Sequence, residues 1–246
     1  MSKPLRVPLD NLTPGVRQLT GAVARYVTRV HRLGPGERLL FFDPTEGTEA
    51  EARLLRGSST DVYCELEAVR PSGYRALPIS LLQGLAKADK PDDVIRDATA
   101  LGVARVVLVQ MERSVARPTP ERSAARLERW KRIAIDAARQ SGRGNIPAIV
   151  GPLGLGELLP GLTEDRRIVL SPNAPPLFES LRPWREGEFI ALLVGPEGGL
   201  SALELELAET AGFTPASLGA TTLRTELAGV AALGALVALN AARALC

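Results

Sequence analysis

Three stretches rich in glycine, proline and small polar residues follow apolar runs directly, and they are the part of this sequence best suited to hold a ligand. They are VLSPNAP (169–175), LVGPEGG (193–199) and ASLGATTLRTELA (216–228). Glycine lets backbone groups approach a ligand closely, and ligands bind at the carboxyl ends of parallel strands. Any one stretch alone could be an ordinary turn. Together they predict one site made mainly of backbone, which suits an uncharged ring such as adenine better than a polyphosphate.

Other familiar sites are not encoded. GPLGLG (151–156) has the wrong spacing for dinucleotide binding, and GPEGG lacks the lysine of a P-loop. His31 is the one histidine, so we expect no Ser-His-Asp or histidine–metal site and interpret His31 as an ordinary polar or RNA-facing residue. Cys64 and Cys246 lack CxxC spacing, so we expect no metal, no disulfide scaffold and a reducing compartment.

The GPEGG stretch is expected to join a buried strand to a helix. Ser201 and Glu204 have the spacing of a capping box, and Leu200 and Leu205 occupy the positions of a hydrophobic staple. Gly212 is placed to end the helix. The sequence therefore predicts strand, glycine turn and helix in succession.

The elements around these turns predict an α/β protein with two domains. Residues 1–74 read as a small β-rich domain, with strands in RLLFFD (38–43), EAEARLL (49–55) and DVYCELEAV (61–69), and 70–75 as a linker. From residue 75 to 246, short apolar strands alternate with helices, which predicts a parallel sheet with helices on both faces.

Charge is unevenly distributed. The chain has a net charge of +2, but residues 75–150 hold 14 Lys and Arg against 8 Asp and Glu. A helix expected over 120–142 places arginines at three-to-four spacing on one stripe, with Leu127, Trp130, Ala134 and Ala137 on another. Such a stripe is either a solvated face or a surface for a polyanion. Its arginines are Arg122, Arg126, Arg129, Arg132, Arg139 and Arg143, and a second basic group contains Arg25, Arg29, Arg32 and Arg38.

The chain is expected to be cytoplasmic and not to enter a membrane. Its start, MSKPLRVPLDNLTPG, has no apolar segment typical of a signal peptide. The longest apolar stretch, 227–239, is shorter than a bilayer span requires. Its small residues suit helix packing.

GPEGG with S-x-x-E after it, followed by LGATTLRTELA, resembles the SPOUT methyltransferases, and most closely the family that methylates N3 of a uridine in 16S ribosomal RNA (rRNA). RVHRLGPGERLLFFD (29–43) resembles that family's PUA-like RNA-binding barrel, and 113–118 and 129–147 resemble its central basic segment. The resemblance implies a deep C-terminal trefoil knot, a homodimer built through residues 75–246, and a substrate in the assembled small ribosomal subunit.

The resemblance also implies the cofactor S-adenosylmethionine (SAM), bound in the knot loops. Carried over by position, the SAM-binding residues are Leu170, Ser171, Gly195, Pro196, Glu197, Gly198, Leu218, Gly219, Leu223 and Arg224. The expected RNA-binding residues are Arg25, Arg29, Arg32, Arg113, Arg139 and Arg143.

Methyl transfer to uridine N3 requires an aligned nucleophile and loss of a weakly acidic proton, so a general base or an anion-stabilising cation would contribute. The catalytic candidates are Arg224 and Glu197, with Glu226, Arg113 and Arg143 also possible by position. Arg224 could instead form a structural salt bridge, and Glu226 could simply favour a helix start. We favour Arg224.

The chain departs from the family's pattern in three places. Asp97 and Ala100 replace a lysine and a glutamate, Leu227 replaces a threonine, and His31 replaces an aliphatic residue. Two alternatives to the uridine-N3 enzyme therefore remain: an RNA-binding or ribosome-assembly protein without catalysis, and a methyltransferase for another RNA site.

Overall fold

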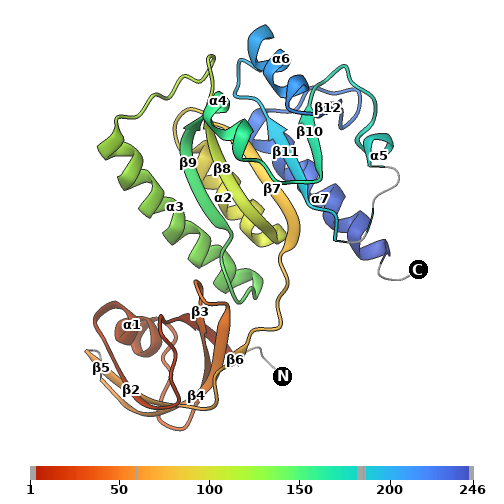
Figure 1. Cartoon of the computed structure of the whole chain (residues 1–246). Coiled ribbons are helices and arrows are strands. Elements are labelled where there is room, and N and C mark those ends of the chain that lie inside the picture. Colours follow the sequence, from red (N-terminus) through yellow and green to blue (C-terminus); the bar gives the residue numbers. More distant parts are fainter. Residues whose placement is uncertain (1–3, 59, 182–184, 186, 244–246) are drawn as a thin grey trace. The chain divides into compact units, whose positions relative to one another are not determined.

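The computed structural model describes residues 4–58, 60–181, 185 and 187–243, and its contacts divide the chain into two compact units (Figure 1). The first unit contains Met1–Arg75 and Ile135–Ile146. The second contains Ala76–Ala134 and Pro147–Cys246. Segment 135–146, which the sequence-based division left in the second domain, thus packs with the first unit.

The first unit is built on a six-stranded sheet in the order β1-β3-β4-β5-β2, with β6 paired to β4. β1 runs parallel to β3, and the other pairs are antiparallel. The predicted RLLFFD strand coincides with β3, whereas β1, β2 and the short helix α1 with the π-helix η1 were not predicted. The elements are β1 (Leu5–Pro8), β2 (Gly15–Thr20), α1 (Gly21–Arg25), η1 (Tyr26–Val30), β3 (Arg38–Asp43), β4 (Thr48–Gly57), β5 (Asp61–Leu66) and β6 (Arg70–Pro71).

The core of this unit is apolar and includes Phe41, Leu54, Val62 and Cys64, each at most 1% exposed. Burial raises the pKa of the Cys64 thiol to about 11, so it stays protonated at neutral pH and packs as a small apolar residue. Cys246 lies outside the described residues.

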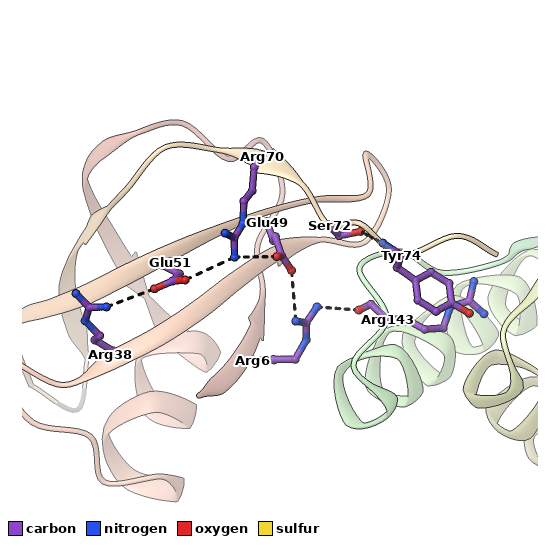
Figure 2. A network of polar contacts seen from close by, with 8 residues as sticks. All are labelled: Arg6, Arg38, Glu49, Glu51, Arg70, Ser72, Tyr74 and Arg143. Carbon is purple, nitrogen blue, oxygen red and sulfur yellow. Dashed lines mark hydrogen bonds and ion pairs between the residues drawn. The ribbon is translucent and has the colours of Figure 1, made fainter. Parts of the chain in front are cut away.

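A chain of polar contacts in the first unit reaches segment 135–146 (Figure 2). The Arg6 guanidinium donates to the Arg143 carbonyl at 2.9 Å and lies 3.5 Å from a Glu49 carboxylate oxygen. Arg70 lies 3.2 Å from Glu49 and 3.5 Å from Glu51. Residues 70 and 71 form β6, so the expectation of a plain linker from residue 70 is wrong.

Arg143 is buried within this unit at 1% exposure. Its guanidinium carbon lies 4.8 Å from the centre of the Tyr74 ring (Figure 2). Its Nη2 donates to Asn145 Oδ1 at 3.3 Å. Helix α3 ends at Ser141, and Gly142 has a φ of +82°, so the chain leaves the helix before residue 143. The expectation that Arg143 extends the exposed arginine stripe to meet RNA is therefore wrong for this structure.

The second unit is an α/β fold around a parallel sheet, as predicted (Figure 1). The strand order, which was not predicted, is β12-β10-β11-β7-β8-β9. β7, β8 and β9 fill one half of the sheet. The chain then crosses to the other half, where β10 forms before β11, and β11 lies beside β7. A reversal of this kind is where ligands bind in α/β sheets. The strands are β7 (Leu77–Gly84), β8 (Val103–Gln110), β9 (Ala148–Gly154), β10 (Arg166–Leu170), β11 (Ile190–Val194) and β12 (Phe213–Ala216).

Helices cover both faces of this sheet. On one face, buried Leu82, Val107 and Leu193 share a cluster with residues of α4, η2 and α6. On the other, α2 packs against α7, and both contact strands of the sheet. The helices from residue 76 onward are α2 (Lys90–Leu101), α3 (Pro120–Ser141), α4 (Leu155–Leu158), η2 (Leu159–Gly161), α5 (Leu177–Ser180), α6 (Ala202–Thr210) and α7 (Thr225–Arg243). The part of α3 from Ile135 belongs to the first unit.

The predicted capping box and glycine end of α6 are confirmed. Ser201 Oγ accepts from Glu204 N at 3.3 Å, and Ser201 N donates to the Glu204 carboxylate at 2.9 Å. Gly212 follows the helix with a φ of +83°. The capping box fixes where the turn after β11 stops and α6 begins.

Helix α7 is longer than its apolar run suggests. Among the described residues, its Thr225–Ala242 window is the one stretch with the length and composition of a membrane span, at a mean hydropathy of 1.5 and with 28% buried. The length argument against a span is therefore wrong. We read α7 as part of the folded unit because it packs on α2, β7 and β11.

Candidate cofactor site

A cavity of about 630 Å³ lies where β10, β11 and β12 end, and the segments after all three strands line it. Its walls also include side chains of Leu200, Leu205 and Lys90. Nine of the ten residues expected to bind the cofactor line it: Leu170, Ser171, Gly195, Pro196, Glu197, Leu218, Gly219, Leu223 and Arg224. The tenth, Gly198, faces Arg113 instead: a Cβ on Gly198 would lie 3.0 Å from Arg113 Cβ.

The start of the GPEGG turn, Gly195 and Pro196, packs closely against the end of β7. A Cβ on Gly84, the last residue of β7, would lie 2.5 Å from Pro196 N and 2.7 Å from the Gly195 carbonyl carbon. A Cβ on Gly195 would lie 2.7 Å from a Leu200 methyl carbon. The wall of the cavity therefore depends on glycine at the end of β7 and at the start of the turn.

Hydrogen bonds join the start of α7 to the same turn. Thr225 Oγ1 donates to the Gly195 carbonyl at 2.5 Å and accepts from Gln83 Nε2 at 2.9 Å. Gln83 is 1% exposed and Thr225 is 6% exposed. These bonds hold three segments of the cavity together.

Thr225→Val is expected to lower the free energy of unfolding by about 1–3 kcal/mol, because the Gly195 carbonyl loses its bond from Thr225 and the buried Gln83 amide keeps only a 3.4 Å bond to the Gly84 carbonyl. Urea unfolding of wild type and variant measures this difference. Thr214→Val is the control, because Thr214 is exposed and its hydroxyl donates to the Arg167 carbonyl at 3.3 Å. Equal losses in the two variants would contradict the role given to Thr225.

The chemistry of the cavity fits SAM. The backbones of residues 218–223 make no hydrogen bond with any other described residue, so their amides and carbonyls are available to a ligand. Parallel pairing continues past β10 and β12, with Ser171 N donating to the Ala216 carbonyl at 2.9 Å, and this orders the segment beside them. Free backbone donors and acceptors with apolar walls suit a purine ring, and the volume suits one ligand of this size.

Three charged side chains meet beside the cavity, and two of them, Lys90 and Glu197, line it. Lys90 Nζ lies 3.1 Å from Glu197 Oε1 and 3.2 Å from Glu226 Oε2. Burial alone would raise the pKa of Glu197, but hydrogen bonds from its own amide, the Lys90 ammonium and the Lys87 amide lower it overall. A carboxylate with a lowered pKa is a weak proton acceptor, which counts against Glu197 as the general base.

Arg224 lies on the cavity wall and is exposed to solvent. Among the residues that the structure describes, its guanidinium has no hydrogen-bond or ion-pair partner. The structural salt bridge considered for Arg224 is thus not formed with any described carboxylate.

Four of the other expected RNA-binding arginines are exposed, whereas Arg139 is half-buried and pairs with Asp136 at 3.3 Å. In the first unit, Arg25, Arg29 and Arg32 are exposed on or just after α1 and η1. Arg139 belongs to the same unit, and its guanidinium carbon lies 4.8 Å from the centre of the Tyr26 ring. In the second unit, exposed Arg113 donates to the Gly198 carbonyl at 2.9 Å.

Sequence reasoning missed Lys90, Gln83 and Thr225 as parts of the site. Lys90 is the first residue of α2, and Gln83 lies near the end of β7. Each precedes the residue that it contacts, Glu197 or Thr225, by more than one hundred positions. These residues reach the cofactor site because the strand order places β7 beside β11. The strand-end rule could have drawn attention to Gln83, because β7 lies beside β11.

Residues 74–237 match the family model of the RNA methyltransferase domain. The ribosomal RNA small subunit methyltransferase E of Synechocystis is 31% identical, over 97% of this chain and 78% of that protein. The enzyme of the same name from Neisseria gonorrhoeae, solved bound to SAM, is 31% identical with a TM-score of 0.85, over 96% and 98% of the two chains. A methyltransferase structure from Legionella pneumophila with SAM bound is 29% identical with a TM-score of 0.87, over 97% and 98%.

The match to the family model covers the whole of the cavity described above, from Lys90 to Ala228. The likeness to the Synechocystis and Neisseria enzymes extends over nearly the full chain, including the first unit. The chain therefore belongs to the RNA methyltransferase family that includes the small subunit ribosomal RNA methyltransferases E.

Proposed function

We propose that this protein methylates N3 of a uridine in 16S rRNA, within the assembled small ribosomal subunit and with SAM as the methyl donor. Its family makes it a SAM-dependent rRNA methyltransferase. The observation that carries the proposal is the cavity at the ends of β10, β11 and β12, which nine carried-over SAM-binding residues line.

The residues of the cavity would hold the cofactor mainly through backbone. The amides and carbonyls of 218–223 would bond the purine, and Leu170, Pro196 and Leu223 would pack against it. When bound, SAM supplies an electrophilic methyl group. The turn at Gly195, held by Thr225 and packed against Gly84, would orient the ligand, so that proximity and alignment would contribute to the rate.

Arg224 is the proposed catalytic residue. Loss of the uridine N3 proton places negative charge on the base, and a nearby guanidinium stabilises that charge as it develops. Arg224 is suited to this because it lies on the cavity wall and is not paired with a described carboxylate. Glu197 would have a positioning role, because its carboxylate is held by Lys90 and its pKa is lowered.

The finer architecture is part of the proposal. We assign residues 1–74 to a PUA-like barrel and 75–246 to a SPOUT domain with a trefoil knot, in which the chain after β12 threads through the loop before it. The bonds from Thr225 to Gly195 and Gln83 are compatible with such threading. We further propose a cytoplasmic homodimer, for which sedimentation should give twice the 26.2 kDa of one chain.

The exposed arginines of the first unit would bind phosphates. Replacing Arg25, Arg29 and Arg32 together with glutamine should weaken small-subunit binding at low salt and flatten its salt dependence, because each lost phosphate contact lowers the slope of log K against log salt by about 0.7–0.9. Filter binding measures the affinity for small subunits at salt concentrations from roughly 50 to roughly 300 mM, a range over which salt increasingly screens the charges. Arg17→Gln, Arg53→Gln and Arg56→Gln together form a control with the same change in charge. An equal effect of both triple variants would refute a specific role for the first set.

Methyl transfer from labelled SAM tests the substrate. Small subunits, large subunits, naked 16S rRNA and tRNA are compared side by side. Label confined to small subunits supports the proposal. Label in another RNA would show that the substrate is that RNA. SAM binding without transfer to any RNA would favour an RNA-binding protein without catalysis.

A further inference from the structure

Lys90 bridges two carboxylates that come from different parts of the second unit. Lys90 is the first residue of α2, Glu197 lies in the turn after β11, and Glu226 is the second residue of α7. The ammonium lies 3.1 Å from Glu197 and 3.2 Å from Glu226, and the three side chains are only 20–26% exposed. At this depth the ion pairs are only partly screened by water.

Arg224 lies next to this cluster but does not join it. It lines the cavity together with Lys90 and Glu197, and it precedes Glu226 by two residues. A guanidinium pairs readily with carboxylates, often through two parallel hydrogen bonds. Glu197 and Glu226 are thus the natural competitors for Arg224, and both are engaged by Lys90 instead.

We propose that Lys90 is a positioning residue that occupies the Glu197 and Glu226 carboxylates and so leaves the Arg224 guanidinium unpaired for the substrate. The inference rests on the proposed function, in which Arg224 stabilises the uridine anion. It assigns Lys90 no contact with the reacting atoms.

The charges of the cluster support this role. The hydrogen bond with Glu197 raises the pKa of Lys90; burial opposes this, and the bond with Glu226 raises the pKa further. Lys90 therefore remains an ammonium at neutral pH. Without it, Glu197 keeps the Lys87 amide at 3.2 Å, whereas Glu226 loses the one ion-pair partner that it has among the described residues. Glu226 is then the carboxylate free to capture Arg224.

The test is a rescue experiment. Lys90→Met should lower kcat at least about tenfold with a smaller change in the KM for SAM, because a captured Arg224 cannot stabilise the developing charge. Adding Glu226→Gln to Lys90→Met should restore kcat to within about threefold of wild type, because the competitor is gone. Lys90→Arg should retain most of the activity. Arg96→Met is the matched control, since Arg96 lies on the same helix and pairs with Asp93 at 2.8 Å and Asp97 at 2.7 Å on its exposed side.

A second readout does not depend on transfer to RNA. An arginine-specific dicarbonyl reagent should modify Arg224 more slowly in Lys90→Met than in wild type, and the added Glu226→Gln should restore the rate; peptide mass spectrometry reports both. Unchanged reactivity in Lys90→Met, or a double variant as impaired as the single one, would overturn the inference. If wild type methylates no RNA while the reactivity pattern holds, the proposed function fails and the role of Lys90 stands.

Discussion

Arg224→Ala is expected to reduce the kcat of methyl transfer by about 10²–10³-fold, the usual cost of removing one group that stabilises developing negative charge. The effect on SAM affinity should be much smaller, because the cavity offers the cofactor mainly backbone, including the unbonded amides of 218–223. Single-turnover rates and calorimetric SAM titration separate the two effects. Arg224→Lys keeps the charge without the planar fork and should fall between wild type and alanine.

The control for this prediction is Arg185→Ala, which removes an exposed arginine of the same unit that does not line the cavity. It should leave kcat near the wild-type value. If Arg224→Ala weakens SAM binding as much as it slows transfer, Arg224 is a cofactor-binding residue and the catalytic role given to it is wrong.

Gly84→Ala should lower SAM affinity at least about tenfold and destabilise the fold by about 1–3 kcal/mol, the usual cost of overpacking a filled site. Its Cβ would lie 2.5 Å from Pro196 N and 2.7 Å from the Gly195 carbonyl carbon. Both atoms belong to the backbone, so no side chain can rotate away and the GPEGG turn itself must move. Calorimetry with SAM and urea unfolding measure the two effects.

Gly154→Ala is the matched control, because Gly154 ends another strand of the same sheet, β9, and a Cβ there meets nothing within 4 Å. It should bind SAM like the wild type. Normal SAM affinity in a folded Gly84→Ala protein would show that the position of the turn does not determine cofactor binding.

The sequence predicted the local parts of the site well because their signals are local. The capping box at Ser201 and Glu204 uses contacts three residues apart, and the apolar runs of β8 and β11 are buried strands of a parallel sheet. The turns after β10, β11 and β12 were identified from glycine and proline alone. That they form one cavity followed from the rule for parallel strands.

These local signals did not predict the contacts between charged side chains at the site. Lys90 meets Glu197 and Glu226 only because α2 and α7 pack on the same side of the sheet, which no spacing in the sequence encodes. The prediction that Arg143 lies on the exposed stripe was wrong because a local signal was extended too far. Helical periodicity was continued past Gly142, whose left-handed φ follows the helix end, and Arg143 packs on the Tyr74 ring instead. The departures at Asp97 and Ala100 do not line the cavity; Asp97 pairs with Arg96, and Ala100 is exposed.

Nucleoside mass spectrometry of small subunits after incubation with isotopically labelled SAM tests the central claim most directly. The substrate subunits come from a strain without its own copy of the enzyme. The account predicts one labelled nucleoside, 3-methyluridine, formed by wild type and lost with Arg224→Ala. Label in any other nucleoside, or equal labelling by wild type and Arg224→Ala, would contradict it.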